Sequence, residues 1–250
     1  FMVDLSPRAH RIHIIVGLLV ASMIFAFLVA IPIYSEEPLS RLQQIQKNGH
    51  LTVLTLNGAA TYYKDANGDN GFEYQLTRLF ADHIGVELKI HTVDNYADIF
   101  KELIFGTGDL AAAGLSKSDF DIPFNVEFGP GYHQIHHQIL YRKGYNQRPK
   151  TLKDLQENGV LEVIEGTSHQ QLLTSFRSLF PDLSWNINND IATEELIELV
   201  EEGLIDYILA DSHEIALQRR FYPELRVAFE VGYPKQLRWA VKESEDRSLM

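Results

Sequence analysis

Three histidines, His133, His136 and His137, form a His-x-x-His-His pattern inside a segment that predicts a β-strand. Imidazole nitrogens are common zinc ligands, but coordination requires that they converge on one point. Successive side chains of a strand point to opposite faces, so His133 and His137 share a face and His136 points away. We therefore expect no metal site from this pattern.

A second candidate for metal chemistry begins at Asp65 and continues through Asn67 and Asp69, with the spacing that opens a calcium-binding loop. Such a loop needs a glycine for its sharp turn and a bidentate glutamate at its end. Asn70 and Leu76 stand at those two positions. The segment is therefore predicted to be a solvated turn, and we expect no metal or other cofactor in this protein.

Composition removes several further classes of function. The chain contains no cysteine, which excludes disulfides, thiolate catalysis, cysteine-based zinc sites and attachment through a lipidated cysteine. The formal net charge is −12, whereas affinity for nucleic acid comes mostly from clustered Lys and Arg. We expect no nucleic-acid partner. With 45% hydrophobic residues in 250, the chain can bury one large core or two modest ones.

An apolar segment near the N-terminus indicates a membrane. Residues 14–33 contain no charged side chain, and twenty helical residues reach across about 30 Å of hydrocarbon. Arg8 and Arg11 precede this segment, and Glu36 and Glu37 follow it. The positive-inside rule then places the N-terminus in the cytoplasm and the bulk of the chain outside the cell membrane.

These residues divide the N-terminal part into a cytoplasmic stretch (1–11), a transmembrane anchor or long signal segment (12–33) and a linker (34–47). Cleavable signal peptides have apolar cores of about 7 to 15 residues and a small-x-small cleavage site. The core here is longer, and residues 30–32 match that site poorly. A retained anchor is favoured over a cleaved signal.

The remaining chain alternates between strand and helix patterns. The first series comprises a strand at 51–56, a helix at 72–84, a strand at 86–93, a helix at 96–104 and a strand at 110–115. A long strand at 131–142 and a polar stretch at 143–150 follow. The second series comprises strands at 160–165, 183–187, 204–210, 225–231 and 236–241, with helices at 169–180, 194–202 and 212–220. This pattern predicts an α/β fold of two lobes with a mostly parallel sheet.

The order of these segments resembles the type II periplasmic solute-binding fold of polar amino-acid receptors. The motifs that carry the resemblance are residues 71–74, 110–116, 166–169 and 206–212. The resemblance implies a ligand cleft between two lobes, at strand ends and helix N-termini. It also implies a solute-binding domain at 48–250, with lobe 1 at 48–142 and 233–250 and lobe 2 at 143–232.

A closer resemblance is to the N-terminal half of the membrane-bound lytic murein transglycosylase F family. It rests on residues 51–57, 61–63, 128–132, 140–144, 181–185 and 222–225. In that family the solute-binding fold lies between a hydrophobic N-terminus and a lysozyme-like catalytic domain. We find no counterpart of the catalytic domain in these 250 residues. The dipeptide Glu243-Ser244 matches the family's catalytic Glu-Ser, but it lies in a polar tail rather than in a helical pocket. We expect no catalytic residue.

The resemblance also implies ligand-binding residues. Gly166, Thr167 and Ser168 stand where a lobe 2 helix begins, and free amides there can hold a carboxylate. The alternative for Ser168 is simple N-capping. Asp211 resembles the acidic residue with which amino-acid receptors bind an α-ammonium group, with a helix cap as the alternative. Tyr62, Tyr63 and Phe72 resemble the aromatic wall of the cleft, with core packing as the alternative. Four further candidates lie in or near the matched motifs: Asn57, Glu73, Gly114 and Ser116.

One departure from the receptors bears on the ligand. After the Gly-Leu-Ser motif, amino-acid receptors carry an arginine that pairs with the ligand carboxylate. Residues 116–121 contain no arginine; Lys117 offers only a point charge, and Asp121 lies nearest to the expected position. A peptide or muropeptide is therefore favoured over a free amino acid.

Three functions remain in competition. The first is a regulatory, ligand-sensing module of a membrane-bound transglycosylase that cleaves murein glycan strands to 1,6-anhydromuramoyl products. Its partners are peptidoglycan fragments, stem peptides or amino acids, the membrane and a C-terminal catalytic domain. The alternative is a membrane-tethered amino-acid or peptide receptor of an ABC-type transporter. The third, an active transglycosylase, requires a glycan groove that the sequence does not supply. We expect the periplasmic side of a Gram-negative membrane, outer by resemblance and inner if the anchor is retained.

Overall fold

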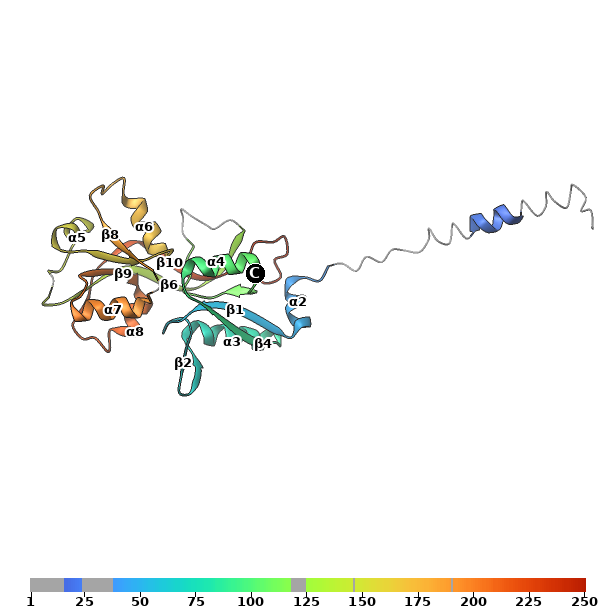
Figure 1. The fold of residues 1–250 in the computed structure, drawn as a ribbon, viewed down its shortest axis with the longest axis horizontal. Helices are drawn as coiled ribbons and strands as arrows, with labels where there is room; N and C mark the ends of the chain where they lie inside the picture. Colours follow the sequence, from blue (N-terminus) through green and yellow to red (C-terminus); the bar gives the residue numbers. More distant parts are fainter. Residues whose placement is uncertain (1–15, 24–37, 118–124, 146, 190) are drawn as a thin grey trace, which may run out of the picture. The chain divides into compact units, whose positions relative to one another are not determined.

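The computed structural model describes residues 16–23, 38–117, 125–145, 147–189 and 191–250 (Figure 1). The chain divides into two compact units, Phe1–Leu39 and Ser40–Met250. In the first unit residues 16–23 are helical. No helix within the described ranges combines the length and the apolar character needed to cross a bilayer. Most of the predicted segment 12–33 falls outside those ranges, so the membrane anchor stays a prediction.

The second unit is built on an eight-stranded sheet in the order β4-β1-β5-β10-β6-β9-β7-β8. Its first elements are α2 (Arg41–Asn48), β1 (His50–Leu56), α3 (Phe72–Ile84), β4 (Glu87–Val93), α4 (Tyr96–Phe105) and β5 (Leu110–Ala111). A separate hairpin of β2 (Tyr63–Asp65) and β3 (Gly68–Asn70) replaces the turn expected near residue 67. The strands β4, β1 and β5 run parallel, as the alternating pattern predicts.

The other elements repeat this alternation on the far side of two long strands. They are β6 (Val126–Arg142), α5 (Leu152–Asn158), β7 (Leu161–Ile164), α6 (Ser168–Phe176), β8 (Trp185–Asn188), α7 (Thr193–Glu202), β9 (Tyr207–Asp211), α8 (Ser212–Gln218) and β10 (Leu225–Lys242). The strands β8, β7 and β9 run parallel, whereas β6 and β10 are antiparallel to their neighbours. The sheet is therefore mixed, and the α/β class is confirmed.

The long strands β6 and β10 pair with each other over most of their length. The pairing runs from Leu225 opposite Arg142 to Lys242 opposite Val126, with four register shifts. Figure 1 shows α5, α6, α7 and α8 gathered around one half of the sheet and α2, α3 and α4 around the other. The predicted lobe boundaries at 142/143 and 232/233 stay a prediction.

Helix ends follow from local chemistry. Ser40 and Gln43 form a capping box at the start of α2, which satisfies two backbone amides. Gly85 ends α3 with φ 76°, a left-handed conformation that favours glycine because it has no Cβ atom.

The sheet is covered on both faces because neighbouring residues of a strand enter different buried clusters. Ile139 and Tyr141 of β6 pack with Leu161, Leu173 and their neighbours. The intervening Leu140 packs on the other side with residues of α7 such as Ile197. Burial of both faces holds the strand ends in fixed positions, and the candidate site lies at such ends.

Candidate functional site

A cavity of about 140 Å³ lies where the two halves of residues 40–250 approach each other. The loop after β5 and helix α4 contribute one wall, and the start of α6 with the end of β9 contributes the other. We call it the Ser116 cavity. Its lining comprises Tyr96, Ala97, Phe100, Gly114, Leu115, Ser116, Phe128, Gly166, Thr167, Ser168, His169, Gln171 and Asp211. Six of the residues predicted from the sequence are thus brought together here: Gly114, Ser116, Gly166, Thr167, Ser168 and Asp211.

Tyr96 joins this cavity to a second one of about 210 Å³, the Asn57 cavity, because its side chain lines both. The Asn57 cavity contains one predicted residue, Asn57, and is rich in carboxylates such as Glu194 and Glu214. Burial, followed by repulsion from Asp211, raises the pKa of Glu214 to about 8. With this pKa the carboxyl group stays mostly protonated at neutral pH, which avoids the cost of burying its charged form.

The start of α6 offers hydrogen-bond donors to the Ser116 cavity. Thr167 is the N-cap; its hydroxyl accepts from the amide of Gln170 at 3.4 Å and donates to the carbonyl of Ile164 at 2.7 Å. Thr167, rather than Ser168, therefore caps the helix. The first amides of a helix have no partner inside it and carry partial positive charge. This end of the cavity is suited to an anionic group.

Ser116 contributes a hydroxyl from the opposite wall. A β-bridge to Leu237 fixes its backbone. Its Oγ atom is buried and has no hydrogen-bond partner among the residues that the structure describes. Buried hydroxyls are nearly always hydrogen-bonded, so this atom is a strong candidate for contact with a ligand.

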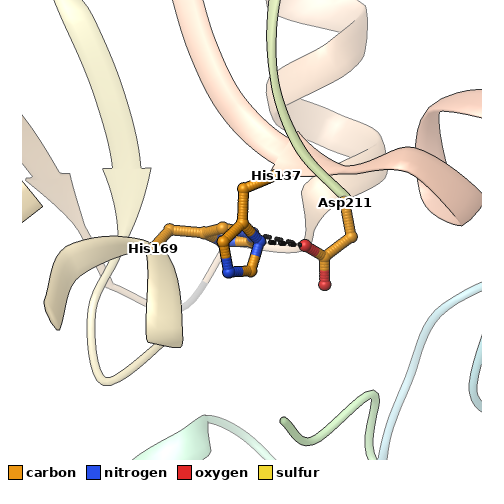
Figure 2. A group of neighbouring side chains, drawn as sticks. All are labelled: His137, His169 and Asp211. Carbon is orange, nitrogen blue, oxygen red and sulfur yellow. Dashed lines mark hydrogen bonds and ion pairs between the residues drawn. The ribbon is translucent and has the colours of Figure 1, made fainter. Parts of the chain in front are cut away.

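Asp211 ends β9, and its carboxylate is already engaged. Figure 2 shows the imidazoles of His137 and His169 directed at one of its oxygens. His137 Nδ1 lies 2.6 Å and His169 Nε2 lies 2.8 Å from Oδ1 of Asp211. All three side chains are buried, and the imidazole rings are T-shaped with centroids 4.6 Å apart. An ammonium group would have to share this carboxylate with two imidazoles.

The charges of the three groups follow from their surroundings. Burial lowers the pKa of His137. Burial also acts to lower the pKa of His169, but attraction to Asp211 outweighs it and raises that pKa. Burial acts to raise the pKa of Asp211, yet the two histidines bring it well below its usual range. Asp211 is therefore ionised, and its charge favours protonation of His169 over protonation of His137.

Glu73, another predicted residue, supports the cavity from behind. Its carboxylate accepts hydrogen bonds from the amide of Gly114 at 2.6 Å and from the hydroxyl of Tyr132. The side chain is buried, and burial raises its pKa to about 7 although both hydrogen bonds act to lower it. Glu73 therefore positions the Gly114 backbone, which lines the cavity.

The three predicted aromatic residues lie outside both cavity linings. Tyr62 donates a hydrogen bond of 2.8 Å to Asp69, and Tyr63 is exposed on the β2–β3 hairpin. Phe72 is 48% exposed and packs near the rings of Tyr132 and His133. Their contribution to ligand binding stays a prediction.

Sequence reasoning missed Tyr96, His137 and His169 as site residues. His137 belongs to the His-x-x-His-His pattern, in which His136 does point elsewhere, toward Glu230 at 2.9 Å. His137 instead contacts Asp211 at the end of β9 and the ring of His169 in α6, which lie 74 and 32 residues further along the chain. No local spacing signals either contact. The Asn95 cap that starts α4 was a usable signal for Tyr96, because it places that residue in the first turn of the helix.

This chain is similar to part of several longer known proteins. No protein-family model matches it. Membrane-bound lytic murein transglycosylase F of Pseudomonas fluorescens is 38% identical over 216 residues, covering 86% of this chain and 44% of that protein. The protein of the same name from Pseudomonas syringae pv. tomato is 35% identical over 251 residues, covering 100% and 48%. The chain is a homologue of these proteins and spans about half of their length.

Solved structures agree on the fold. An amino acid ABC transporter substrate-binding protein from Streptococcus pneumoniae, bound to L-arginine, superposes with a TM-score of 0.71 at 20% identity. The similarity covers 83% of this chain and 87% of that one. The α/β fold of residues 40–250 is therefore that of the type II periplasmic solute-binding proteins, as the sequence predicts.

Proposed function

We propose that this chain is a ligand-binding module at the periplasmic side of a membrane, and that it regulates a transglycosylase that cleaves murein. Homology to proteins named membrane-bound lytic murein transglycosylase F supports the second part of the proposal. Those relatives are about twice as long as the region they share with this chain. We assign cleavage of glycan strands to 1,6-anhydromuramoyl products to a catalytic domain beyond that region.

The observation that carries the binding function is the unpartnered hydroxyl of Ser116, facing a helix start across a cavity. Among the described residues, the buried Oγ of Ser116 has no hydrogen-bond partner, and the N-cap Thr167 lines the same cavity. A ligand that bonds to both walls favours the approach of the two halves of the unit. A ligand shifts such an equilibrium only through a difference in affinity between the two arrangements.

A peptide derived from murein stems fits this site better than a free amino acid. An α-amino acid needs an anion pocket and an unoccupied carboxylate for its ammonium group. Asp211, the candidate for the second role, is bonded to two histidines. A stem peptide carries carboxylates that the start of α6 can bind, and its length lets it extend from the Ser116 cavity toward the Asn57 cavity along Tyr96.

Calorimetric titration tests the proposal with the full chain. The probes are a murein tripeptide stem and single amino acids, including L-alanine, L-glutamate and L-arginine. We expect the tripeptide to bind at least tenfold more tightly than any single amino acid. Ser116→Ala should weaken tripeptide binding, whereas Ser184→Ala, at an exposed position before β8 and outside both cavity linings, should not. Failure of the tripeptide to bind, or equal effects of the two substitutions, contradicts the proposal.

The second candidate is a membrane-tethered amino-acid or peptide receptor of an ABC-type transporter. The similarity of fold to a substrate-binding protein that holds L-arginine favours it. The same titration separates the candidates, because tight and selective binding of one amino acid supports the receptor. The reading frame beyond residue 250 provides an independent test: a lysozyme-like domain there supports the regulatory module.

A further inference from the structure

We propose that His137, His169 and Asp211 form a binding site for a divalent transition-metal cation of the zinc class. Each residue comes from a different element of the fold. His137 and Asp211 are directly opposite partners in the antiparallel pair of β6 and β9. His169 is the second residue of α6, which follows β7, and β7 pairs with β9. The backbone therefore brings the three side chains together independently of any ligand.

The geometry is close to that of a three-residue zinc site. One ligand atom from each residue lies within 4.8 Å of the other two (Figure 2). Tetrahedral zinc with bonds of about 2.0–2.1 Å separates its ligand atoms by about 3.3 Å. The two nitrogen–oxygen contacts here are 2.6 and 2.8 Å. To admit the ion, the contact of His137 needs to lengthen by about 0.7 Å and that of His169 by about 0.5 Å, changes within reach of small side-chain rotations.

The ring of His137 has one nitrogen in the cluster and one outside it. Nδ1 is bonded to Asp211, whereas Nε2 has no hydrogen-bond partner in the part of the chain that the structure describes. The side chain of His137 is only 1% exposed, so the cluster is shielded from bulk solvent. Nδ1 is therefore the nitrogen that His137 offers to an ion.

The surroundings favour a cation with an open coordination position. The carboxylate of Asp211 lies between the two imidazoles, and Glu194 lines the adjoining Asn57 cavity. His169 and Asp211 line the Ser116 cavity. A fourth ligand, either water or a carboxylate of a bound molecule, can therefore approach from that cavity. Such an ion would take the role of the arginine that residues 116–121 lack.

The ligand set selects the kind of metal. Two imidazoles and one carboxylate suit zinc, cobalt or nickel, whereas magnesium and calcium prefer a shell of oxygen atoms. Zinc is the ion we expect, and cobalt is its spectroscopic substitute. Since water can supply the fourth ligand, the test requires only the metal and the protein, without a bound peptide. Its outcome is separate from that of the proposed peptide binding.

Titration of the wild-type protein is the first experiment. The full chain, purified without a histidine tag and stripped with a chelator, should bind one Zn²⁺ per chain, and excess Mg²⁺ or Ca²⁺ should not compete. Co²⁺ should give the visible absorption of a tetrahedral site. Side-chain ¹⁵N spectra of histidine should change at His137 and His169 on addition of Zn²⁺. Absence of binding, or changes confined to His133 and His213, overturns the proposal.

Matched variants provide the second experiment. His137→Gln and His169→Gln should each weaken Zn²⁺ binding by about 100-fold, whereas His136→Gln should leave it unchanged. His136 belongs to the same strand, but its imidazole contacts Glu230 and faces away from the site. Circular dichroism in the absence of metal verifies that each variant is folded. Equal affinity in all three variants overturns the proposal, and the ¹⁵N spectra of the wild type decide the question if a variant does not fold.

Discussion

The carboxylate of Glu194, in the first turn of α7, accepts a hydrogen bond of 2.6 Å from the backbone amide of Ala59, in the loop after β1. The two residues are 135 positions apart and belong to different halves of residues 40–250. A Cβ atom on the neighbouring Gly58 would lie 3.3 Å from the same carboxylate oxygen. This contact holds the two halves together beside the Asn57 cavity.

Glu194→Ala should release that contact. A hydrogen bond to a charged group contributes about 1.5–3 kcal/mol, and partial exposure places this one at the lower end. We expect amide hydrogen exchange at Ala59 to become about tenfold faster, as a loss of about 1.4 kcal/mol predicts. Glu195→Ala removes the same charge from an exposed neighbour and is the control. Equal exchange rates in the two variants would show that the contact does not restrain the halves.

A second contact between the halves involves a glycine. Gly166 has φ +75°, and a Cβ atom there would lie 3.3 Å from Cβ of Tyr96. Gly144 has φ +84° with nothing within 4 Å of its added Cβ. Both Gly→Ala substitutions incur the left-handed backbone cost of about 1 kcal/mol, but only Gly166→Ala also pushes against α4.

In urea unfolding we therefore expect Gly166→Ala to lose about 1 kcal/mol more stability than Gly144→Ala, as an overpacked contact typically costs 1–3 kcal/mol. The comparison cancels the backbone cost that the two positions share. Identical losses would mean that Tyr96 moves aside freely and does not fix the distance between the halves.

The fold was predictable because its signals are local. The apolar periodicity of residues 72–84 gives α3 with the same bounds, Phe72–Ile84. The pairing of strands is not local, and there the sequence was less informative. Residues 225–231 and 236–241 were predicted to be two strands, but they belong to the single strand β10. Its register shifts between Val231 and Lys235, and Gly232 with φ 75° accommodates the irregularity that the sequence signalled as a break.

The site was predictable only where it follows from the ends of elements. The helix start at residues 166–168 is visible as a break between a strand pattern and a helix pattern, and these residues do line the Ser116 cavity. The contacts of Asp211 are different. They require the register that sets His137 opposite Asp211 and the placement of α6 beside both. Neither property is encoded in residue spacing, so a metal site was not expected from the sequence.

Glu73 should make stability depend on pH. Its folded pKa of about 7 lies above the ordinary value of 4.5, so the folded state retains a proton that the unfolded state releases. Stability contributed by the protonated form is complete below pH 4.5 and is lost as the pH rises to about 7. Each pKa unit corresponds to about 1.4 kcal/mol, so the loss is about 3 kcal/mol.

Urea unfolding at pH 5 and pH 8 measures this effect, and Glu73→Gln is the reference because it has no proton to lose. We expect the wild type to lose about 2.5 kcal/mol more than the variant between the two pH values, because part of the total loss occurs below pH 5. Parallel pH profiles would contradict the assignment. Tyr132→Phe removes a hydrogen bond that lowers the pKa of Glu73, so the carboxyl titration followed by ¹³C NMR should move to higher pH.

Substitution of two threonine N-caps, one at the cavity and one away from it, can distinguish an effect on ligand binding from an effect on stability. Thr167 caps α6 and lines the Ser116 cavity, whereas Thr151 caps α5, away from that cavity, through the amide of Asp154 at 3.3 Å. Loss of an N-cap costs about 0.5–2 kcal/mol, so both Thr→Ala variants should be destabilised by about 1 kcal/mol in urea. Only Thr167→Ala should also weaken binding of the murein tripeptide, by about tenfold in calorimetric titration, because it disturbs the amides that face the cavity. If both variants bind the tripeptide equally well, the start of α6 is not part of the binding site.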